Sequence, residues 1–204
     1  FMEKGTDTGG AVQDIAVLGQ NMHRMVQNIL DVMVLNDHKL QPRRSSVDLA
    51  EVLNNAAHTF LPAGQKTSHE IIVNVSTDLP PVPLDRDLIQ RVIENIIENS
   101  LKYSPKNTEI LIRTELSPEH EIVIEISDEG EGIPEEFREK VFEVNTRLEK
   151  HATVETRMSR GLGLAFCKMA VEAHGGRIWI RDNKPSGAVF CIRLPINPIN
   201  RLYI

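Results

Sequence analysis

The sequence contains little cysteine, which restricts both its covalent and its metal chemistry. Among 204 residues only Cys167 and Cys191 are cysteines, and their spacing matches no metal-ligand motif. The first falls in a helical pattern and the second in a strand-like pattern. We therefore expect two buried free thiols in a protein of a reducing compartment.

Basic charge and long apolar runs are also scarce. The chain has 23 Lys and Arg against 29 Asp and Glu, a net charge of −6. A broad nucleic-acid surface, which needs clustered basic residues, is therefore not expected, whereas a small anionic ligand is compatible with this charge. No apolar run approaches the roughly 20 residues that span a bilayer, and the first ten residues lack the regions of a signal peptide. We expect a cytoplasmic chain without membrane contact, although its parent protein could be membrane-anchored.

A long helix is predicted near the N-terminus. Its apolar residues alternate steps of four and three, as in a heptad seam: Ala11, Ile15, Leu18, Met22, Met25, Ile29 and Val32. A second apolar row beside this seam makes the stripe wider than a two-stranded coil needs. We predict a homodimer formed through residues 8–37. A helix folded back on its own domain is the alternative.

The polar, proline-containing stretch that follows predicts a linker, so we divide the chain into residues 1–44 and 45–204. In the second domain, hairpin-joined strands alternate with helices, which predicts an α/β two-layer sandwich: a mixed, mainly antiparallel sheet with helices on one face. The expected helices are residues 48–60, with Asp48 as N-cap, 85–102, 134–142 and 161–176. The expected strands are residues 70–76, 82–85, 108–116, 121–127, 177–183 and 187–195.

The helix at residues 85–102 places two amides, Asn95 and Asn99, one turn apart on the flank of an apolar stripe. Asparagine is a weak helix former, so the pair calls for a compensating partner. The pair could bind a ligand, lie on a solvated flank, or consist of two core amides that satisfy each other.

Two glycine-containing segments follow. In the first, Asp128 ends a strand before Gly130 and Gly132, which suits recognition of an exocyclic amine but also describes a tight turn. In the second, Gly161 and Gly163 begin a helix whose free N–H groups suit a phosphate. It is not a Walker loop, and the strand-first context of a dinucleotide fold is missing.

The asparagine pair, the DxGxG segment, Phe142 and the GLGL segment, in this order, resemble the ATP-binding domain of sensor histidine kinases. That domain has the Bergerat fold, which is shared with gyrase-type ATPases. The resemblance covers roughly residues 45–195. The heptad helix resembles the second helix of the family's dimerisation and phosphotransfer bundle.

The resemblance implies ATP and Mg²⁺ as cofactors and a role for each matching residue. Asn99 resembles the magnesium ligand, and Asn95 the amide that faces the phosphates beside the metal. Lys102 resembles a phosphate-contacting lysine, Tyr103 an aromatic against the nucleotide, and Asp128 the acceptor of the adenine amino group. The rest of the implied pocket consists of Gly130, Gly132, Ile133, Phe142, Gly161, Leu162, Gly163 and Leu164.

The ATP lid that the resemblance places at residues 145–160 departs from the family pattern. Asn145 stands where a second phenylalanine is usual, and Ser159 with Arg160 replace a glycine and a small residue. Arg160 or Arg157 could reach the γ-phosphate, where a guanidinium stabilises charge during phosphoryl transfer. A solvated lid charge is the alternative.

The resemblance favours a kinase over a hydrolase. In hydrolytic relatives a glutamate occupies the position of Asn95, and an amide cannot act as a general base. None of the seven histidines has the sequence context of the family's phosphoacceptor, so we expect a fragment that phosphorylates a histidine on a bundle helix absent from this chain. A response regulator receiver domain is the expected downstream partner. The alternative is a nucleotide-binding scaffold without kinase activity.

Overall fold

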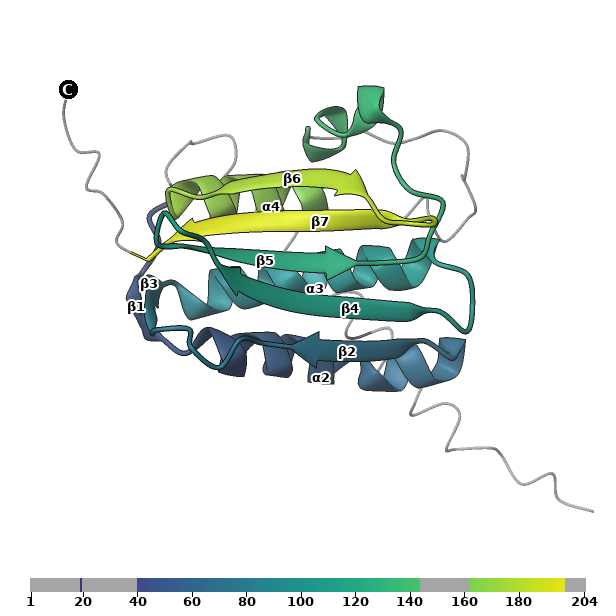
Figure 1. Cartoon of the computed structure of the whole chain (residues 1–204), viewed down its shortest axis with the longest axis horizontal. Helices are drawn as coiled ribbons and strands as arrows, with labels where there is room; N and C mark the ends of the chain where they lie inside the picture. The colour runs from purple at the N-terminus through teal and green to yellow at the C-terminus, as the bar shows by residue number, and fades with distance from the viewer. Residues whose placement is uncertain (1–18, 20–39, 144–161, 197–204) are drawn as a thin grey trace, which may run out of the picture. The chain divides into compact units, whose positions relative to one another are not determined.

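Five strands form one mixed sheet in the order β2-β4-β5-β7-β6 (Figure 1). The computed structural model describes Gly19 and residues 40–143 and 162–196. Strands β2 and β4 are parallel, and all other neighbours are antiparallel, which confirms the predicted sheet. The strands are β2 (Glu70–Asn74), β4 (Glu109–Leu116), β5 (Glu121–Ser127), β6 (Arg177–Asp182) and β7 (Ala188–Pro195).

By its contacts the chain divides into residues 1–39 and 40–204. The predicted bundle helix and dimer contact at residues 8–37 lie outside the described residues, apart from Gly19, and stay predictions. Residues 43 and 44, which we assigned to the linker, belong to the second unit. The backbone N–H of Arg43 donates to Asp85, and the guanidinium of Arg44 donates to the carbonyl of Ala173.

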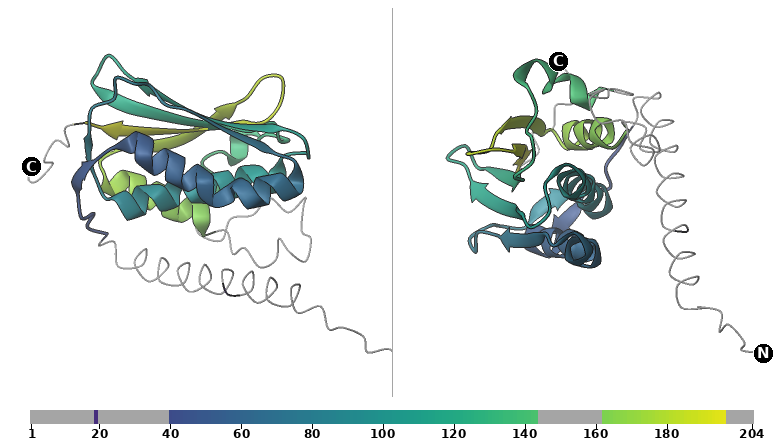
Figure 2. Two further views of the ribbon diagram at one scale, coloured as in Figure 1. Left: turned by 90° about the horizontal axis from the view of Figure 1, so that it is seen from below. Right: turned by 90° about the vertical axis from the view of Figure 1, so that its right-hand side faces the viewer.

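Three helices cover one face of the sheet (Figure 2). They are α2 (Leu49–Thr67), α3 (Arg86–Tyr103) and α4 (Gly163–Ala173), with α3 packed against both of the others. Alternate residues of the strands point at them, and several of these are fully buried isoleucines: Ile110, Ile112, Ile122, Ile124 and Ile126. Burying one such side chain contributes about 1.5–3 kcal/mol, so this layer is a main source of stability.

Specific signals mark the start of α2 and the end of α4 where the sequence indicates. The Asp48 carboxylate accepts from the Ala50 N–H at 2.9 Å, which confirms the predicted N-cap of α2. Helix α4 ends in a Schellman motif, in which Gly175 has a φ of +79° and Gly176 donates to the carbonyl of Val171. A glycine is needed at 175 because this φ strains other residues.

Three local features differ from the prediction. Residues Ser45–Val47 form β1, which pairs with β3 (Val82–Leu84), although no strand was predicted there. Helix α2 continues past the predicted end, through Pro62, to Thr67. The expected helix at 134–142 is instead two 3₁₀ turns, η1 (Glu135–Phe137) and η2 (Lys140–Phe142).

The prediction of two buried free thiols is confirmed. Cys167 and Cys191 are both free and buried. Within residues 40–143 and 162–196, the structure contains no helix with the length and hydropathy of a membrane span.

A buried histidine joins the end of α4 to the start of α3. His174 is 2% exposed, and its Nε2 accepts from the Asp85 N–H at 3.0 Å while Nδ1 lies 2.7 Å from the Ala170 carbonyl. Nδ1 must donate to a carbonyl and Nε2 must accept from an N–H, so the ring is neutral. Burial, the largest effect, lowers the pKa of His174, and the nearby Arg44 adds to the shift, whereas the hydrogen bond to Ala170 opposes it.

We expect this histidine to make the fold sensitive to acid. Because its pKa is lowered by folding, the unfolded chain binds the proton first, and stability is lost as the pH falls below the unfolded value of about 6.5. One such group contributes a slope of at most about 1.4 kcal/mol per pH unit. Urea unfolding between pH 7.5 and 5 should show this slope in wild type and lose it in His174→Gln. His58→Gln, at an exposed site on α2, should keep the wild-type slope; equal slopes in all three proteins would contradict the assignment.

Candidate functional site

Helix α3 carries the two amides on the flank of its buried stripe, as the helical wheel predicted. Asn95 and Asn99 are half-buried, whereas Lys102 and Tyr103 at the helix end are exposed. The Lys102 ammonium lies 5.1 Å from the centroid of the Tyr103 ring. The residues of the predicted stripe, Ile89, Val92, Ile93, Ile96 and Ile97, are at most 1% exposed.

Asp128, directly after β5, is a buried carboxylate held by three donors. Its Oδ1 accepts from the backbone N–H groups of Gly130 and Ala188, each at 3.0 Å. Its Oδ2 accepts from the hydroxyl of Ser100 on α3 at 3.2 Å. The carboxylate therefore ties the end of β5 to β7 and to the helix that carries the amides.

The environment of Asp128 raises the pKa of its carboxyl group. Burial, which disfavours the charged form, is the largest effect, and the hydrogen bonds from Ala188, Gly130 and Ser100 oppose it. A carboxylate kept from water but supplied with fixed donors is a strong acceptor for one further N–H group.

Glycines allow the backbone to close around this carboxylate. A side chain at Gly130 would lie 3.0 Å from the Tyr103 carbonyl, and one at Gly132, whose φ is +73°, would lie 3.0 Å from the Gly187 carbonyl. The Cβ position at Gly187 would be 1.9 Å from the Asp128 carbonyl oxygen. The DxGxG turn is therefore packed against both α3 and the β6–β7 hairpin.

The start of α4 faces Asn95. Leu162 is buried before the first helical residue, and the space where Gly163 would carry a Cβ lies 3.2 Å from Asn95 Oδ1. Among the described residues, Asn95 Nδ2 is one of three buried side-chain polar atoms without a hydrogen-bond partner. The alternative of two mutually satisfied amides therefore fails for Asn95, and this donor is available to a ligand at the helix N-terminus.

The other predicted residues are placed as follows. Ile133 and Leu164 are partly buried, and the Ile133 carbonyl accepts from Arg138 Nε at 2.9 Å. Phe142 on η2 is 6% exposed and packs in the hydrophobic core. Arg160, Gly161 and the lid at 145–160 lie outside the described residues, so their roles stay predictions.

The sequence analysis missed three residues that support Asp128. Ser100 was detectable, because it occupies the next position of the α3 apolar stripe, where a hydroxyl needs a partner. Asn183 Nδ2 donates to the Asp128 carbonyl at 2.8 Å, and Gly187 passes close to the same carbonyl. These two contacts join segments that are distant in sequence, and no local pattern indicates them.

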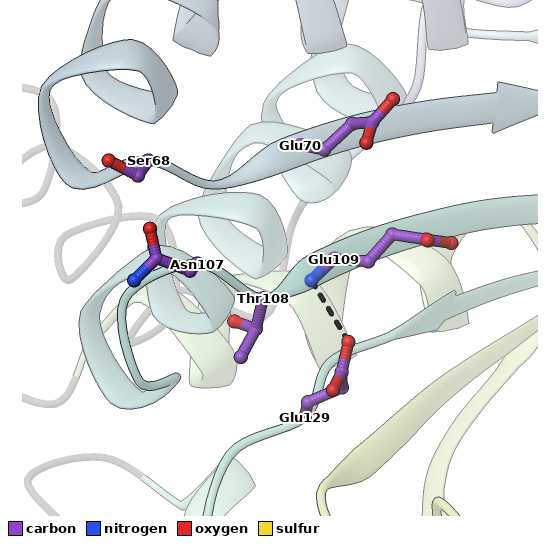
Figure 3. Close-up of a pocket in the computed structure, with 6 residues that line it drawn as sticks. All are labelled: Ser68, Glu70, Asn107, Thr108, Glu109 and Glu129. Carbon is purple, nitrogen blue, oxygen red and sulfur yellow. Dashed lines mark hydrogen bonds between the residues drawn. The ribbon is translucent and has the colours of Figure 1, made fainter.

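A separate cavity of about 300 Å³ lies where β2 and β4 begin (Figure 3). Its lining is acidic and contains no predicted site residue: Ser68, Glu70, Asn107, Thr108, Glu109 and Glu129. Glu129 accepts from the Glu109 N–H at 3.0 Å. Within the described residues, no group of three or more acidic, histidine or cysteine side chains is arranged to hold a metal ion. The carboxylates would repel a triphosphate, so the lining of this cavity does not favour the phosphates of a nucleotide.

Comparison with known proteins agrees with the fold and the motifs. The adaptive-response sensory kinase SasA of Gloeothece citriformis is 31% identical over 179 residues, which cover 86% of this chain and 44% of that protein. The solved mycobacterial sensor histidine kinase MprB is 28% identical with a TM-score of 0.63, covering 76% of this chain and 99% of that one. Full-length ShkA in complex with AMPPNP has a TM-score of 0.77 at 20% identity, covers 97% of this chain and 41% of that one, and supports the fold alone.

The chain spans less than half the length of the curated relatives that it matches. A family model described as histidine kinase-, DNA gyrase B- and HSP90-like ATPase matches residues 84–198, which is more than half of the chain. The resemblance to the catalytic domain of sensor histidine kinases is thereby confirmed, and the chain belongs to the histidine kinase-, DNA gyrase B- and HSP90-like ATPase family.

Proposed function

We propose that this chain is the catalytic portion of a sensor histidine kinase. It binds Mg²⁺-ATP and transfers the γ-phosphoryl group to a histidine on a bundle helix that the chain does not contain. The observation that carries the proposal is the position of Asn95. A neutral amide with an unpartnered donor faces the glycine start of α4, at the place where a hydrolase would need a general base.

Each part of the nucleotide has a matching group. The adenine amino group donates to Asp128, whose Oδ1 is already occupied by two backbone donors. The phosphates lie against Asn95 Nδ2, Lys102 and the first N–H groups of α4, which have no intrahelical acceptors. Glycine at 163 allows the Asn95 amide to lie close to this helix end.

The residues present also fit a magnesium ion. The Asn99 amide oxygen, with Asn95 beside it, would hold the ion together with phosphate oxygens and water, because Mg²⁺ prefers oxygen ligands and keeps much of its hydration. When bound, the ion neutralises charge that develops on the phosphates during transfer. Asn95 and Lys102 orient the phosphates, and the buried Asp128 fixes the base.

A carboxylate that could activate water is not available at position 95. Glu94, its neighbour on α3, accepts a hydrogen bond from Gln90 at 2.9 Å on a different side of the helix. This arrangement favours transfer to a protein acceptor over hydrolysis. SasA and MprB are both named as kinases, so a nucleotide-binding scaffold without kinase activity is not favoured.

The direct test supplies the missing acceptor. The chain, γ-labelled ATP and Mg²⁺ are mixed with a full-length, catalytically dead copy of the parent protein, and acid-labile, base-stable phosphate is measured. We expect labelled histidine in the dead copy. Nucleotide binding without any transfer would support the scaffold, and sustained acceptor-independent hydrolysis above about 1 s⁻¹ would support a hydrolase.

Replacement of Asn99 by aspartate tests the metal site. The added carboxylate lies beside the phosphates, so we expect phosphotransfer to fall by about 100-fold and the dependence on Mg²⁺ concentration to change. Transfer rates are measured over a Mg²⁺ titration. Asn55→Asp, which makes the same charge change at an exposed position of α2, should behave as wild type. Equal rates and equal Mg²⁺ dependence in Asn99→Asp would remove Asn99 from the metal site.

Arg160 remains a proposed contact to the γ-phosphate. If Arg160→Ala retains wild-type transfer, this role is removed for that residue. The homodimer through residues 8–37 and the receiver-domain partner also belong to this proposal, since both concern the whole sensor kinase.

A further inference from the structure

The hydroxyl of Ser100 lies in an unusual place for a polar group. Ser100 is fully buried on the inner stripe of α3, in line with Ile93, Ile96 and Ile97. Its Oγ lies 3.2 Å from Oδ2 of Asp128, the residue directly after β5. A buried hydroxyl is costly without a partner, and here its partner is the carboxylate of the proposed base site.

The two carboxylate oxygens of Asp128 differ in how many further hydrogen bonds they can accept. Oδ1 accepts from the N–H groups of Gly130 and Ala188, which are fixed by the backbone. Oδ2 accepts only from Ser100 among the described residues. A carboxylate oxygen accepts about two hydrogen bonds, so Oδ2 keeps one acceptor position and Oδ1 keeps none.

We infer that Ser100 is a positioning residue that determines specificity for a 6-aminopurine. By donating to Oδ2, its hydroxyl occupies one acceptor position and leaves the other for the exocyclic amine of the nucleotide. A 6-oxo purine presents an acceptor to the same oxygen and is rejected. This inference rests on the proposed function, because it requires ATP to bind at Asp128.

Removal of the hydroxyl changes the carboxyl group in a predictable direction. Burial already raises the pKa of Asp128, and Ser100 is one of three hydrogen bonds that oppose this effect. Without Ser100, the pKa of Asp128 should rise further, and a proton on Oδ2 would point an O–H donor at the ligand's amine. The preference for the amine should therefore weaken, although Gly130 and Ala188 still hold Oδ1.

The experiment compares two nucleotides and three proteins. Binding of ATP and of purine riboside triphosphate, which lacks the 6-amino group, is measured by calorimetry with Mg²⁺ present. Wild type should prefer ATP by about 10- to 100-fold, the effect of a hydrogen bond to a charged group. In Ser100→Ala this ratio should fall by about 3- to 10-fold.

A matched control is available one turn further along the chain. Ser104 caps α3, and its hydroxyl is also buried but has no hydrogen-bond partner among the described residues. Ser104→Ala should keep the wild-type ratio. A purely structural role of Ser100 would reduce affinity for both nucleotides equally, so the ratio separates positioning from folding.

The remaining outcomes test the role of Ser100 and the proposed function separately. If Ser100→Ala does not fold, Ser100→Cys, nearly isosteric with a weaker donor, should give an intermediate ratio. If the wild-type protein prefers ATP as expected and the Ser100 variants have the same ratio of affinities for the two nucleotides, this inference alone is overturned. A wild-type protein that binds neither nucleotide overturns the proposed function, and this inference falls with it.

Discussion

Asp128→Asn is expected to lower the affinity for ATP by about 100-fold while the fold is retained. The amide oxygen can replace Oδ1 and keep the bonds from Gly130 and Ala188, so the NH₂ group takes the place of Oδ2. Ser100 can accept from this group because a hydroxyl also accepts. Two donors then face each other when the adenine amine approaches, and the base is no longer recognised.

Calorimetry with Mg²⁺-ATP measures this loss, and urea unfolding at pH 7 checks the fold. The unfolding free energy should not fall, because the substitution removes a buried charge whose raised pKa shows that its environment disfavours it. Asp78→Asn, at an exposed position, serves as the control. If Asp128→Asn bound ATP as tightly as the parent protein, the DxGxG segment would be a structural turn only.

Gly187→Ala is expected to lower the free energy of unfolding by more than about 3 kcal/mol. The new Cβ would lie 1.9 Å from the Asp128 carbonyl oxygen and 2.9 Å from the Glu129 Cα. Both are backbone atoms, so no side-chain rotation can relieve the overlap. The φ of Gly187 is +111°, a region that residues with a Cβ rarely adopt.

The control for this substitution separates the energetic cost of a positive φ from the cost of steric overlap with the neighbouring backbone. Gly175 also has a positive φ, but a Cβ there would meet only Pro195 Cγ, at 3.7 Å. Gly175→Ala should therefore cost about 1–2 kcal/mol, the conformational cost alone. Urea unfolding of both variants measures the difference. If Gly187→Ala lost no more unfolding free energy than Gly175→Ala, the backbone of the β6–β7 hairpin would have to shift at little cost to remove the overlap.

Local patterns were sufficient to predict most of the elements. Helix α3 was predicted almost to the residue because its apolar stripe has a clear helical period and Asp85 caps its start. The β4–β5 hairpin was predicted because its strands alternate in polarity around a turn that contains Pro118. These signals are repeated several times within each segment, so a single sequence shows them.

Short elements were not predictable in this way. The three residues of β1 carry no alternation long enough to recognise, and their conformation depends on pairing with β3. Pro62 signals a helix end in most contexts, but α2 packs against α3 and β2 and continues past it. The turns η1 and η2 are too short for a periodic pattern, and they are held by core contacts of Phe137 in η1 and of Val141 and Phe142 in η2.

For the candidate site, the sequence by itself determined which chemical groups are present. They are an amide pair, a carboxylate at the end of a strand, and glycines at a helix start. Their residue types and short spacings are local properties, and these identified the family. Only the tertiary structure decided which atoms meet. The bonds from Ser100 to Oδ2 and from Ala188 to Oδ1, and the close approach of Gly187, join residues 28 to 60 positions apart. Such contacts depend on how the sheet and helices pack, because no periodic pattern in a sequence records a distance between distant segments.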